Sequence, residues 1–277
     1  MTNSNSKNYY SGPVVVIVGP TGSGKTGVSI EIAKKLKDFE PFKGFDGPAA
    51  EIISADSRAI YKYMDIGTAK PSVEEQDGIP HWGIDLVEPG ERFTVADWKA
   101  YAEQKIEEIR SRGRVPMVVG GTGLYVDALV YGYHFIGKTG EKVKNTPDVQ
   151  IEQKICSDRQ KMLPGYCIFG IKWSPEELRE RLTLRANNLF TQDLYKETDF
   201  LVKKFGWGSQ AMKSNIYQFA WDYMEGNITE TEAKRQFILD DWHLAKRQIT
   251  WFKRNKKIVW LPLEKVCESV LKCIQDG

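Results

Sequence analysis

The feature that most constrains the fold is a glycine-rich stretch directly after a short apolar run. Five β-branched residues, Val14–Val18, lead into Gly19-Pro20-Thr21-Gly22-Ser23-Gly24-Lys25-Thr26. This stretch matches G-x-x-x-x-G-K-[ST], the phosphate loop, whose glycines let backbone N–H groups turn toward an anion. A helix is predicted to begin at Lys25, and its N-terminus would add partial positive charge there. The chain is therefore predicted to hold a diphosphate or triphosphate between a strand and a helix.

Two side chains of this loop have predicted roles of their own. Lys25 would bridge phosphate oxygens, and Thr26 would ligate Mg²⁺. The loop does not specify which bond breaks. Most proteins with such a loop act on a phosphoryl group and place an acid after an apolar strand. Here the apolar run 115–119 leads into Gly-Gly-Thr-Gly, and Asp85 follows only a weak strand pattern, which disfavours an ordinary ATPase.

The rest of the chain alternates between strand and helix patterns. Such alternation predicts an α/β fold, in which a parallel sheet carrying the phosphate loop is flanked by helices. A mostly helical C-terminal part is expected from 175 to about 255, with breaks at Gly206–Gly208 and Gly226. We expect a disordered lead-in at 1–12, a catalytic core at 13–132, a flexible, shortened insert region at 133–165, and a helical part that completes the core at 166–277. The predicted strands are 14–18, 51–54, 115–119, 165–173 and 258–261.

Composition and charge narrow the function classes. Hydrophobic content of 41% and charged content of 27% are ordinary for a globular protein. Neither a membrane span nor a signal peptide is apparent, so a cytoplasmic location is expected. Four cysteines without CxxC spacing and three histidines disfavour a zinc site and suggest reduced thiols. Residues 1–137 carry a net charge of −3 and residues 138–277 a net charge of +5, which permits a polyanionic partner.

Further motifs follow the predicted strands. Ser54-Ala55-Asp56-Ser57-Arg58 comes directly after the second strand. An aspartate there would lie at the carboxyl edge of the sheet, where ligands bind in such folds, although it could instead cap the next helix. The later motifs are Tyr61-Lys62-Tyr63-Met64-Asp65-Ile66-Gly67-Thr68-Ala69-Lys70-Pro71, Ile79-Pro80-His81-Trp82-Gly83-Ile84-Asp85 and Gly120-Gly121-Thr122-Gly123-Leu124-Tyr125.

Taken together, these motifs resemble those of the tRNA dimethylallyltransferases, also called tRNA isopentenyltransferases. Four motifs stand in that family's order over residues 14–132, and Ala245-Lys246-Arg247-Gln248-Ile249-Thr250-Trp251-Phe252 resembles its late motif. The resemblance implies transfer of a dimethylallyl group from dimethylallyl diphosphate to N6 of an adenine beside the anticodon of tRNA. It implies Mg²⁺ as cofactor, and we expect a monomer with tRNA and the diphosphate donor as partners.

The resemblance also assigns roles to single residues. Asp56 would accept a proton from the adenine amine, which is a poor nucleophile. Lys25, the loop N–H groups and Mg²⁺ would stabilise the leaving diphosphate, which accounts for the missing acid after 115–119. Chemistry at N6 requires that the adenosine be flipped out of its stack. The residues implied to contact tRNA are Asp56, Ser57, Arg58, Ala59, Thr122, Lys246, Arg247, Gln248 and Trp251.

A basic and aromatic cluster on one predicted helix supports a nucleic-acid partner independently. Basic side chains can neutralise phosphates, and aromatic rings can stack on bases. The alternative is that Ile249, Trp251 and Phe252 pack inward while the charges form a solvated face. The cluster comprises Lys246, Arg247, Lys253, Arg254, Lys256 and Lys257 with Trp251 and Phe252.

The chain departs from the family pattern in its middle and in several cations. Family members usually carry a longer helical insert, and their Gly-Tyr motif corresponds here to Ile216-Tyr217-Gln218-Phe219. One family arginine aligns with Trp242 and another near Gln150. Three alternatives therefore stay open: prenyl transfer to a free adenine nucleotide, a small-molecule kinase, and a tRNA-binding protein without catalysis.

Overall fold

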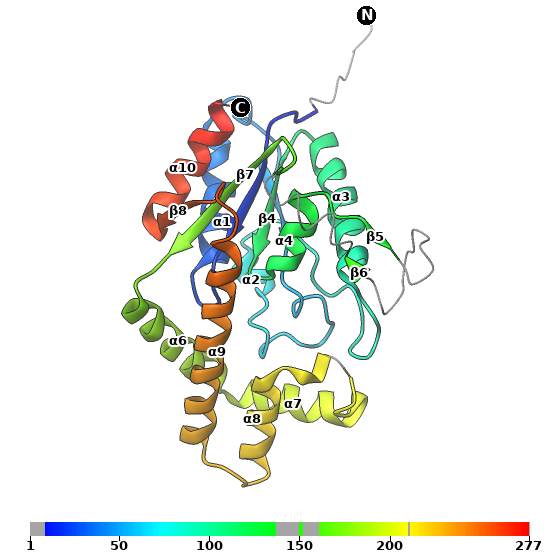
Figure 1. Cartoon of the computed structure of the whole chain (residues 1–277), viewed down its shortest axis with the longest axis vertical. Coiled ribbons are helices and arrows are strands. Elements are labelled where there is room, and N and C mark those ends of the chain that lie inside the picture. The colour runs from blue at the N-terminus through cyan, green and yellow to red at the C-terminus, as the bar shows by residue number, and fades with distance from the viewer. Residues whose placement is uncertain (1–8, 137–149, 152–160, 210, 277) are drawn as a thin grey trace, which may run out of the picture.

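A six-stranded parallel sheet forms the centre of the protein (Figure 1). The computed structural model describes residues 9–136, 150–151, 161–209 and 211–276. Strand β1 lies between β4 and β7, with Val15 opposite Met117 on one side and Cys167 on the other. The predicted α/β class is confirmed. In sheet order, the strands are β3 (His81–Trp82), β2 (Ala50–Ser54), β4 (Val115–Gly120), β1 (Val14–Val18), β7 (Tyr166–Lys172) and β8 (Val259–Pro262).

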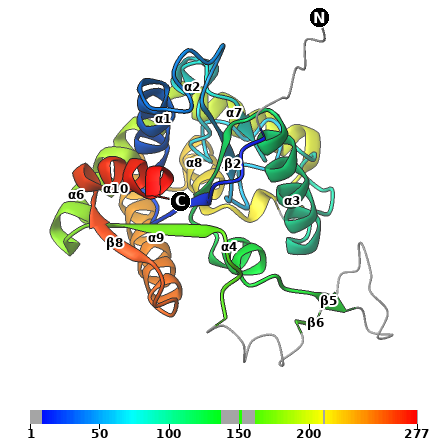
Figure 2. The ribbon, with the colours of Figure 1, turned by 90° about the horizontal axis from the view of Figure 1, so that it is seen from above.

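Helices cover both faces of this sheet (Figure 2). Helices α1 (Lys25–Lys35) and α10 (Leu263–Asp276) pack on one face, over side chains such as Ile17. Helices α3 (Val95–Ser111) and α4 (Gly123–Val130) pack on the other, over side chains such as Val16. Because both faces are covered, β1 is apolar at every position, as the uninterrupted run in its sequence indicated.

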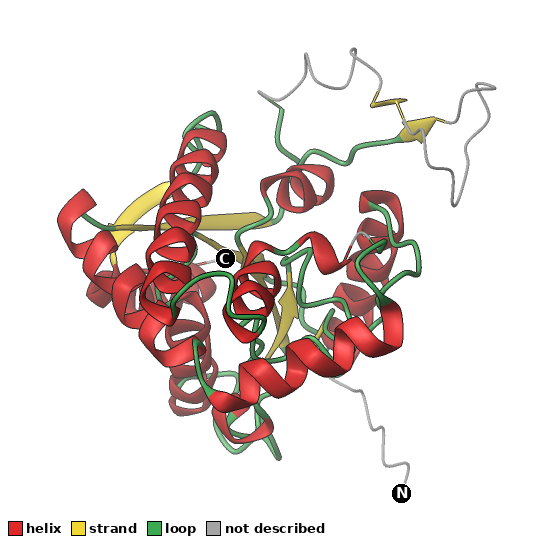
Figure 3. Cartoon of the chain, turned by 90° about the horizontal axis from the view of Figure 1, so that it is seen from below, coloured by secondary structure: helices red, strands yellow, loops and turns green. Residues whose placement is uncertain are grey.

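The helical part lies beyond the carboxyl edge of the sheet, because α6 continues from the end of β7 (Figures 1 and 3). A capping box at Ser174 starts α6, and Gly206 ends α7 with a φ of 65°. The breaks predicted at Gly206 and Gly226 are confirmed. No helix in the described part of the chain is long and apolar enough to cross a membrane. The helices are α6 (Pro175–Leu189), α7 (Gln192–Phe205), α8 (Asn215–Met224) and α9 (Glu230–Phe252).

Short elements complete the fold. The 3₁₀ turn Leu36–Asp38 extends α1, and the 3₁₀ turn Ala211–Lys213 precedes α8. Helix α2 (Val73–Gln76) is a single capped turn. Strands β5 (Phe135–Ile136) and β6 (Gln150–Ile151) form a separate antiparallel pair.

Two segments expected to be flexible are ordered where the structure describes them. Tyr10, placed in the predicted lead-in, is 9% exposed, and its backbone N–H donates to the Arg110 carbonyl at 3.0 Å. Tyr133 and Phe135, placed in the predicted insert region, are buried in a cluster with Ala128 of α4. Both predictions were wrong for these residues because their aromatic rings bury apolar area. Residues 1–8, 137–149 and 152–160 lie outside the described residues.

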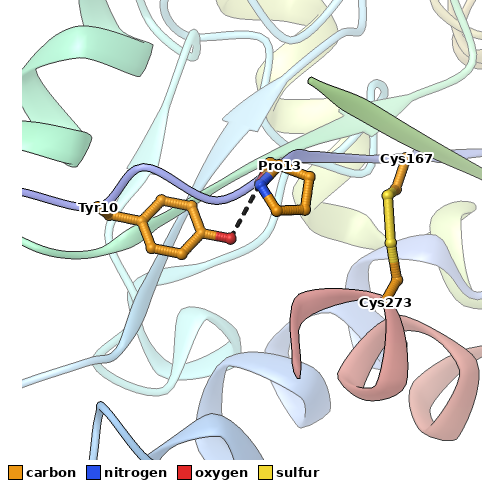
Figure 4. The surroundings of a disulfide bond; sticks show 4 residues. All are labelled: Tyr10, Pro13, Cys167 and Cys273. Atoms are coloured by element: carbon orange, nitrogen blue, oxygen red, sulfur yellow. Dashed lines mark hydrogen bonds between the residues drawn. A yellow bond between two sulfur atoms is a disulfide. The ribbon is translucent and has the colours of Figure 1, made fainter. Parts of the chain in front are cut away.

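The prediction that all cysteines are thiols was wrong for two of them. Cys167 of β7 and Cys273 of α10 form a disulfide that joins the sheet to a covering helix (Figure 4). The two residues are 106 positions apart, so no local spacing could indicate the pair. Cys267 is a buried thiol, and burial raises its pKa to about 11. Cys156 lies outside the described residues.

Candidate active site

The phosphate loop lies at the carboxyl end of β1, between the strand and helix that its sequence predicted. Gly22 and Gly24 have φ values of 72° and 87°, which side chains rarely permit. The Lys25 ammonium donates to the carbonyls of Gly19 at 3.0 Å and Pro20 at 2.7 Å. Burial lowers the pKa of Lys25 to about 8, and the Asp56 carboxylate opposes that shift. A phosphate anion beside Lys25 would likewise favour its charged form.

Three side chains from the second half of the chain hold this loop from outside. The Trp173 indole donates to the Ser23 carbonyl at 3.1 Å, and the Arg181 guanidinium donates to the Gly22 carbonyl at 2.7 Å. The third is Gln248, whose side-chain oxygen accepts the backbone N–H of Thr21 at 2.8 Å. The shape of the loop therefore depends on residues at least 150 positions away from it.

The Asp56 turn is joined to the Gly-Gly-Thr-Gly turn that follows β4. The Thr122 hydroxyl oxygen accepts the backbone N–H of Ser57 at 3.0 Å, and Asp56 Oδ1 accepts that of Arg58 at 2.8 Å. A Cβ at Gly120 would lie 2.2 Å from the Ala55 carbonyl oxygen. Glycine is thus required at position 120 because the two turns touch through their backbones.

One cavity of about 530 Å³ brings the predicted motifs together. Its walls come from the phosphate loop, the Asp56 turn, the Gly67–Ala69 segment and helices α6, α8 and α9. Of the residues predicted for the site, those lining it are Thr21, Gly22, Ser23, Gly24, Lys25, Thr26, Asp56, Ser57, Arg58, Thr122, Arg247 and Gln248.

Several predicted residues lie outside this cavity. The carbonyls of Gly19 and Pro20 accept hydrogen bonds from the Lys25 ammonium. Ala59 is 6% exposed and does not line the cavity, so the geometry gives no support to its expected contact with tRNA. Lys246 and Trp251 line a separate surface hollow of about 490 Å³ with His243, Arg247, Thr250 and Arg254.

The aromatic residues Trp251 and Phe252 of α9 are more buried than residues whose rings are free to stack on nucleic-acid bases. Phe252 is 1% exposed and belongs to the core. Trp251 is partly buried, and its indole donates to the Asp127 carboxylate at 2.9 Å. The Arg254 guanidinium lies 5.1 Å from the centre of the Trp251 ring. The alternative of inward packing is thus correct for Phe252 and partly so for Trp251, while the basic side chains of the cluster are exposed.

Sequence reasoning missed Arg185, a cation that lines the cavity. Arg185 of α6 forms an ion pair with Asp241 of α9. The Asp241 residue is 6% exposed. Burial raises the pKa of Asp241, and Arg185 counteracts part of that rise. A signal was present, because Arg185 follows Leu182 by three positions and so continues the apolar face of α6.

Trp242 stands where the family pattern led us to expect an arginine. Its ring lies 4.4 Å from the Arg179 guanidinium carbon and 5.7 Å from the Lys246 ammonium. Both cations are within cation–π distance of the ring. Positive charge is therefore still present next to the position where the family has an arginine. Trp242 itself packs on the cluster of Leu178, Leu182 and Ala245 rather than facing the cavity.

Comparisons with known proteins give the family and the fold of this chain. A family model described as IPP transferase matches residues 59–164 and 150–255. The chain belongs to the IPP transferase family. This IPP transferase is 33% identical to the tRNA dimethylallyltransferase of Staphylococcus saprophyticus, over 93% of this chain and 94% of that protein. It is 29% identical to the tRNA dimethylallyltransferase of Bacillus subtilis, over 94% of each chain.

Solved structures share the fold of this IPP transferase. The tRNA isopentenylpyrophosphate transferase of Staphylococcus epidermidis is 31% identical, with a TM-score of 0.72 over 95% of this chain and 97% of that one. The corresponding Bacillus halodurans protein is 27% identical, with a TM-score of 0.74 over 95% and 96%. The alignment with the B. subtilis relative spans 306 positions, more than the 277 residues here, so part of the relative lacks a counterpart in this chain.

Proposed function

We propose that this IPP transferase moves a dimethylallyl group from dimethylallyl diphosphate to N6 of the adenine next to the anticodon of a tRNA. The observation that carries the proposal is the single cavity that holds both the phosphate loop and Asp56. The names of the relatives support the reaction and the tRNA acceptor. Because the phosphate loop, Asp56 and Arg185 of the same chain line this cavity together, we propose that the enzyme acts as a monomer.

The diphosphate end of the donor fits the phosphate loop. The loop N–H groups, the α1 N-terminus and Lys25 would stabilise the charge that develops on the leaving diphosphate. Arg185 would add a further cation in the same cavity. Within the cavity, Ile216, Phe237 and Leu244 offer apolar side chains that suit the five-carbon group.

Magnesium fits the same end of the cavity. Thr26 is exposed in the first turn of α1 and lines the cavity, as a hydroxyl ligand requires. In the described part of the chain, no three His, Cys, Asp or Glu side chains form a metal site by themselves. This suits Mg²⁺, which is commonly held by few protein ligands together with phosphate oxygens and water. When bound, Mg²⁺ would neutralise charge on the diphosphate.

Asp56 is proposed as the base for the acceptor. The adenine N6 lone pair would form the new bond to the first carbon of the dimethylallyl group. The C–O bond would break with its electron pair leaving on the diphosphate, and the N6 proton would pass to Asp56. Ser57, Arg58 and Thr122 lie beside Asp56 and would contact the flipped nucleoside.

The exposed basic side chains of α9 are proposed to bind the tRNA backbone. Arg247 lines both the cavity and the adjoining hollow, so it connects the two. Lys246 on α9 and Arg254 in the turn just after its end extend this surface. Contacts of this kind release counterions, so tRNA affinity should fall steeply as salt rises.

The first test is transfer of radiolabel from dimethylallyl diphosphate, with Mg²⁺, to unmodified tRNA and separately to AMP. Label on tRNA alone supports the proposal, and digestion then locates the modified adenine. Label on AMP alone would instead identify a free-nucleotide transferase. Binding of tRNA without any label would show a protein that has lost catalysis.

Two variants separate the proposed roles. Asp56→Ala should abolish most transfer while leaving diphosphate affinity nearly unchanged, because the base and the phosphate loop are separate groups. Lys25→Ala should weaken donor binding. Unchanged turnover in Asp56→Ala, or unchanged donor affinity in Lys25→Ala, would remove that residue from its assigned role.

A further inference from the structure

We propose that Gln248 is a positioning residue that fixes the phosphate loop against the turn beside Asp56. This inference rests on the proposed function, because Gln248 would set the distance between the donor diphosphate on the phosphate loop and the proposed base, Asp56. The Gln248 side chain reaches from α9 between two turns that follow different strands. Its oxygen accepts the Thr21 backbone N–H at 2.8 Å, and its nitrogen donates to the Gly121 carbonyl at 3.1 Å.

Both polar atoms of this side chain are used by backbone groups of the protein. An amide that accepts on one side and donates on the other can satisfy this pair of partners in one orientation only. The close contact at Gly121 gives independent support, since a Cβ there would lie 2.4 Å from the Gln248 nitrogen. Gly121 thus leaves the space that the Gln248 amide occupies.

The contact continues from Gly121 toward the proposed base. Thr122, the next residue, donates its backbone N–H to the Ala55 carbonyl at 3.0 Å and accepts that of Ser57 with its hydroxyl at 3.0 Å. Ala55 and Ser57 flank Asp56. A continuous series of hydrogen bonds therefore runs from the phosphate loop through Gln248 to both neighbours of the base.

This geometry differs from the role that the resemblance implied for Gln248, a contact with tRNA. A side chain engaged at both ends in holding the loop should act first on the donor. Group transfer is sensitive to small errors in position, and a shift of about 1 Å can cost about 100-fold in rate. We therefore expect replacement of Gln248 to weaken diphosphate binding without tRNA and to lower kcat with it.

The test is calorimetric binding of inorganic diphosphate with Mg²⁺ in the absence of tRNA. Gln248→Met keeps similar volume and removes both hydrogen bonds, and should weaken binding roughly tenfold. Gln236→Met is the matched control, because Gln236 lies on the same helix, is also partly exposed, and bonds only to Glu232 at 2.9 Å among the contacts described for its side chain. The control should bind diphosphate like the unaltered protein.

Gly121→Ala provides a second route to the same contact. It should weaken diphosphate binding as well. The double variant should lose little more diphosphate affinity than whichever single variant binds diphosphate less tightly, because both changes remove the same interaction. In transfer assays, Gln248→Met should lower kcat while KM for tRNA stays within about twofold, which a loss of tRNA contact would not produce.

Normal diphosphate affinity in Gln248→Met, combined with a raised KM for tRNA alone, would overturn the inference and restore a tRNA-contact role. Additive losses in the double variant would also contradict it. The binding measurement needs no acceptor, so failure of the protein to modify tRNA would refute the proposed function without changing this outcome.

Discussion

Glu197 of α7 fastens the helical part to the segment that forms one wall of the cavity. Its carboxylate accepts the backbone N–H groups of Asp65 at 2.9 Å, Ile66 at 2.8 Å and Gly67 at 2.9 Å. The Tyr217 hydroxyl donates to the same carboxylate at 2.8 Å. We predict that Glu197→Ala releases this wall and lowers both stability and transfer activity.

The expected loss of unfolding free energy depends on which hydrogen-bond partners of Glu197 water can reach. Asp65 is exposed, so water replaces its bond at little cost, whereas Gly67 is buried and Tyr217 is 0% exposed. Burial, with the Glu197 carboxylate second, raises the pKa of Tyr217 well above its usual value, so its hydroxyl stays a donor. Leaving these donors unpaired should cost about 3 kcal/mol in total, and Tyr217→Phe about 1 kcal/mol.

The measurement is thermal unfolding followed by circular dichroism. For a chain of this size about 3 kcal/mol corresponds to a fall in Tm of roughly 6–12 °C, and about 1 kcal/mol to roughly 2–4 °C. Lys196→Ala is the control, since that neighbouring side chain on α7 is 77% exposed. The reasoning would be refuted if the Tm of Glu197→Ala lay within about 2 °C of the Tm of the control, since that difference is far smaller than the expected fall. It would also be refuted if Tyr217→Phe lowered the Tm as much as Glu197→Ala does.

Three more changes test other parts of the structure. Glu51→Gln should cost about 3 kcal/mol at neutral pH, because Glu51 is 1% exposed and bonds two arginines. Burial raises the pKa of Glu51 but these bonds lower it more. Its stabilisation is therefore present above pH 4.5 and lost as pH falls through the lower folded-state pKa, so urea unfolding curves of protein and variant should converge in acid. Gly120→Ala should cost more than about 3 kcal/mol by denaturant unfolding, since the clash is with backbone at Ala55; Gly27→Ala, whose Cβ meets nothing within 4 Å, should not destabilise. Arg185→Gln should weaken inorganic diphosphate binding about tenfold, and unchanged calorimetric affinity would remove Arg185 from the diphosphate site.

The local parts of this structure could be predicted because short sequence patterns specify them. A run of β-branched residues before Gly19 predicted a buried strand, and the loop after it predicted a helix from Lys25. The breaks at Gly206 and Gly226 were equally visible, because glycine adopts the φ values that end a helix there. Asp56 could be placed at the carboxyl edge of the sheet because it directly follows a strand.

The contacts between distant segments could not be predicted in this way. Arg181 and Gln248 reach the phosphate loop across 159 and 227 positions, and no period or spacing in the sequence encodes such pairs. The disulfide of Cys167 is of the same kind. Arg185 was missed for a different reason, because a single charged residue on an otherwise apolar helix face belongs to no motif that would single it out.

The Gly-Gly-Thr-Gly motif illustrates how a local pattern acquires its meaning from those distant contacts. A Cβ at Gly120 would meet the Ala55 carbonyl, one at Gly121 the Gln248 amide, and one at Gly123 the Trp251 ring at 2.2 Å. The absence of a side chain at each glycine therefore leaves room for a different neighbouring residue, either in the Asp56 turn or on α9. The turn is a junction at which the sheet and α9 are held together, and the phosphate loop joins it through Gln248. Because the proposed base and the proposed donor site both attach to this junction, a change at any of its three glycines should disturb donor binding and transfer together, even though no glycine side chain takes part in the chemistry.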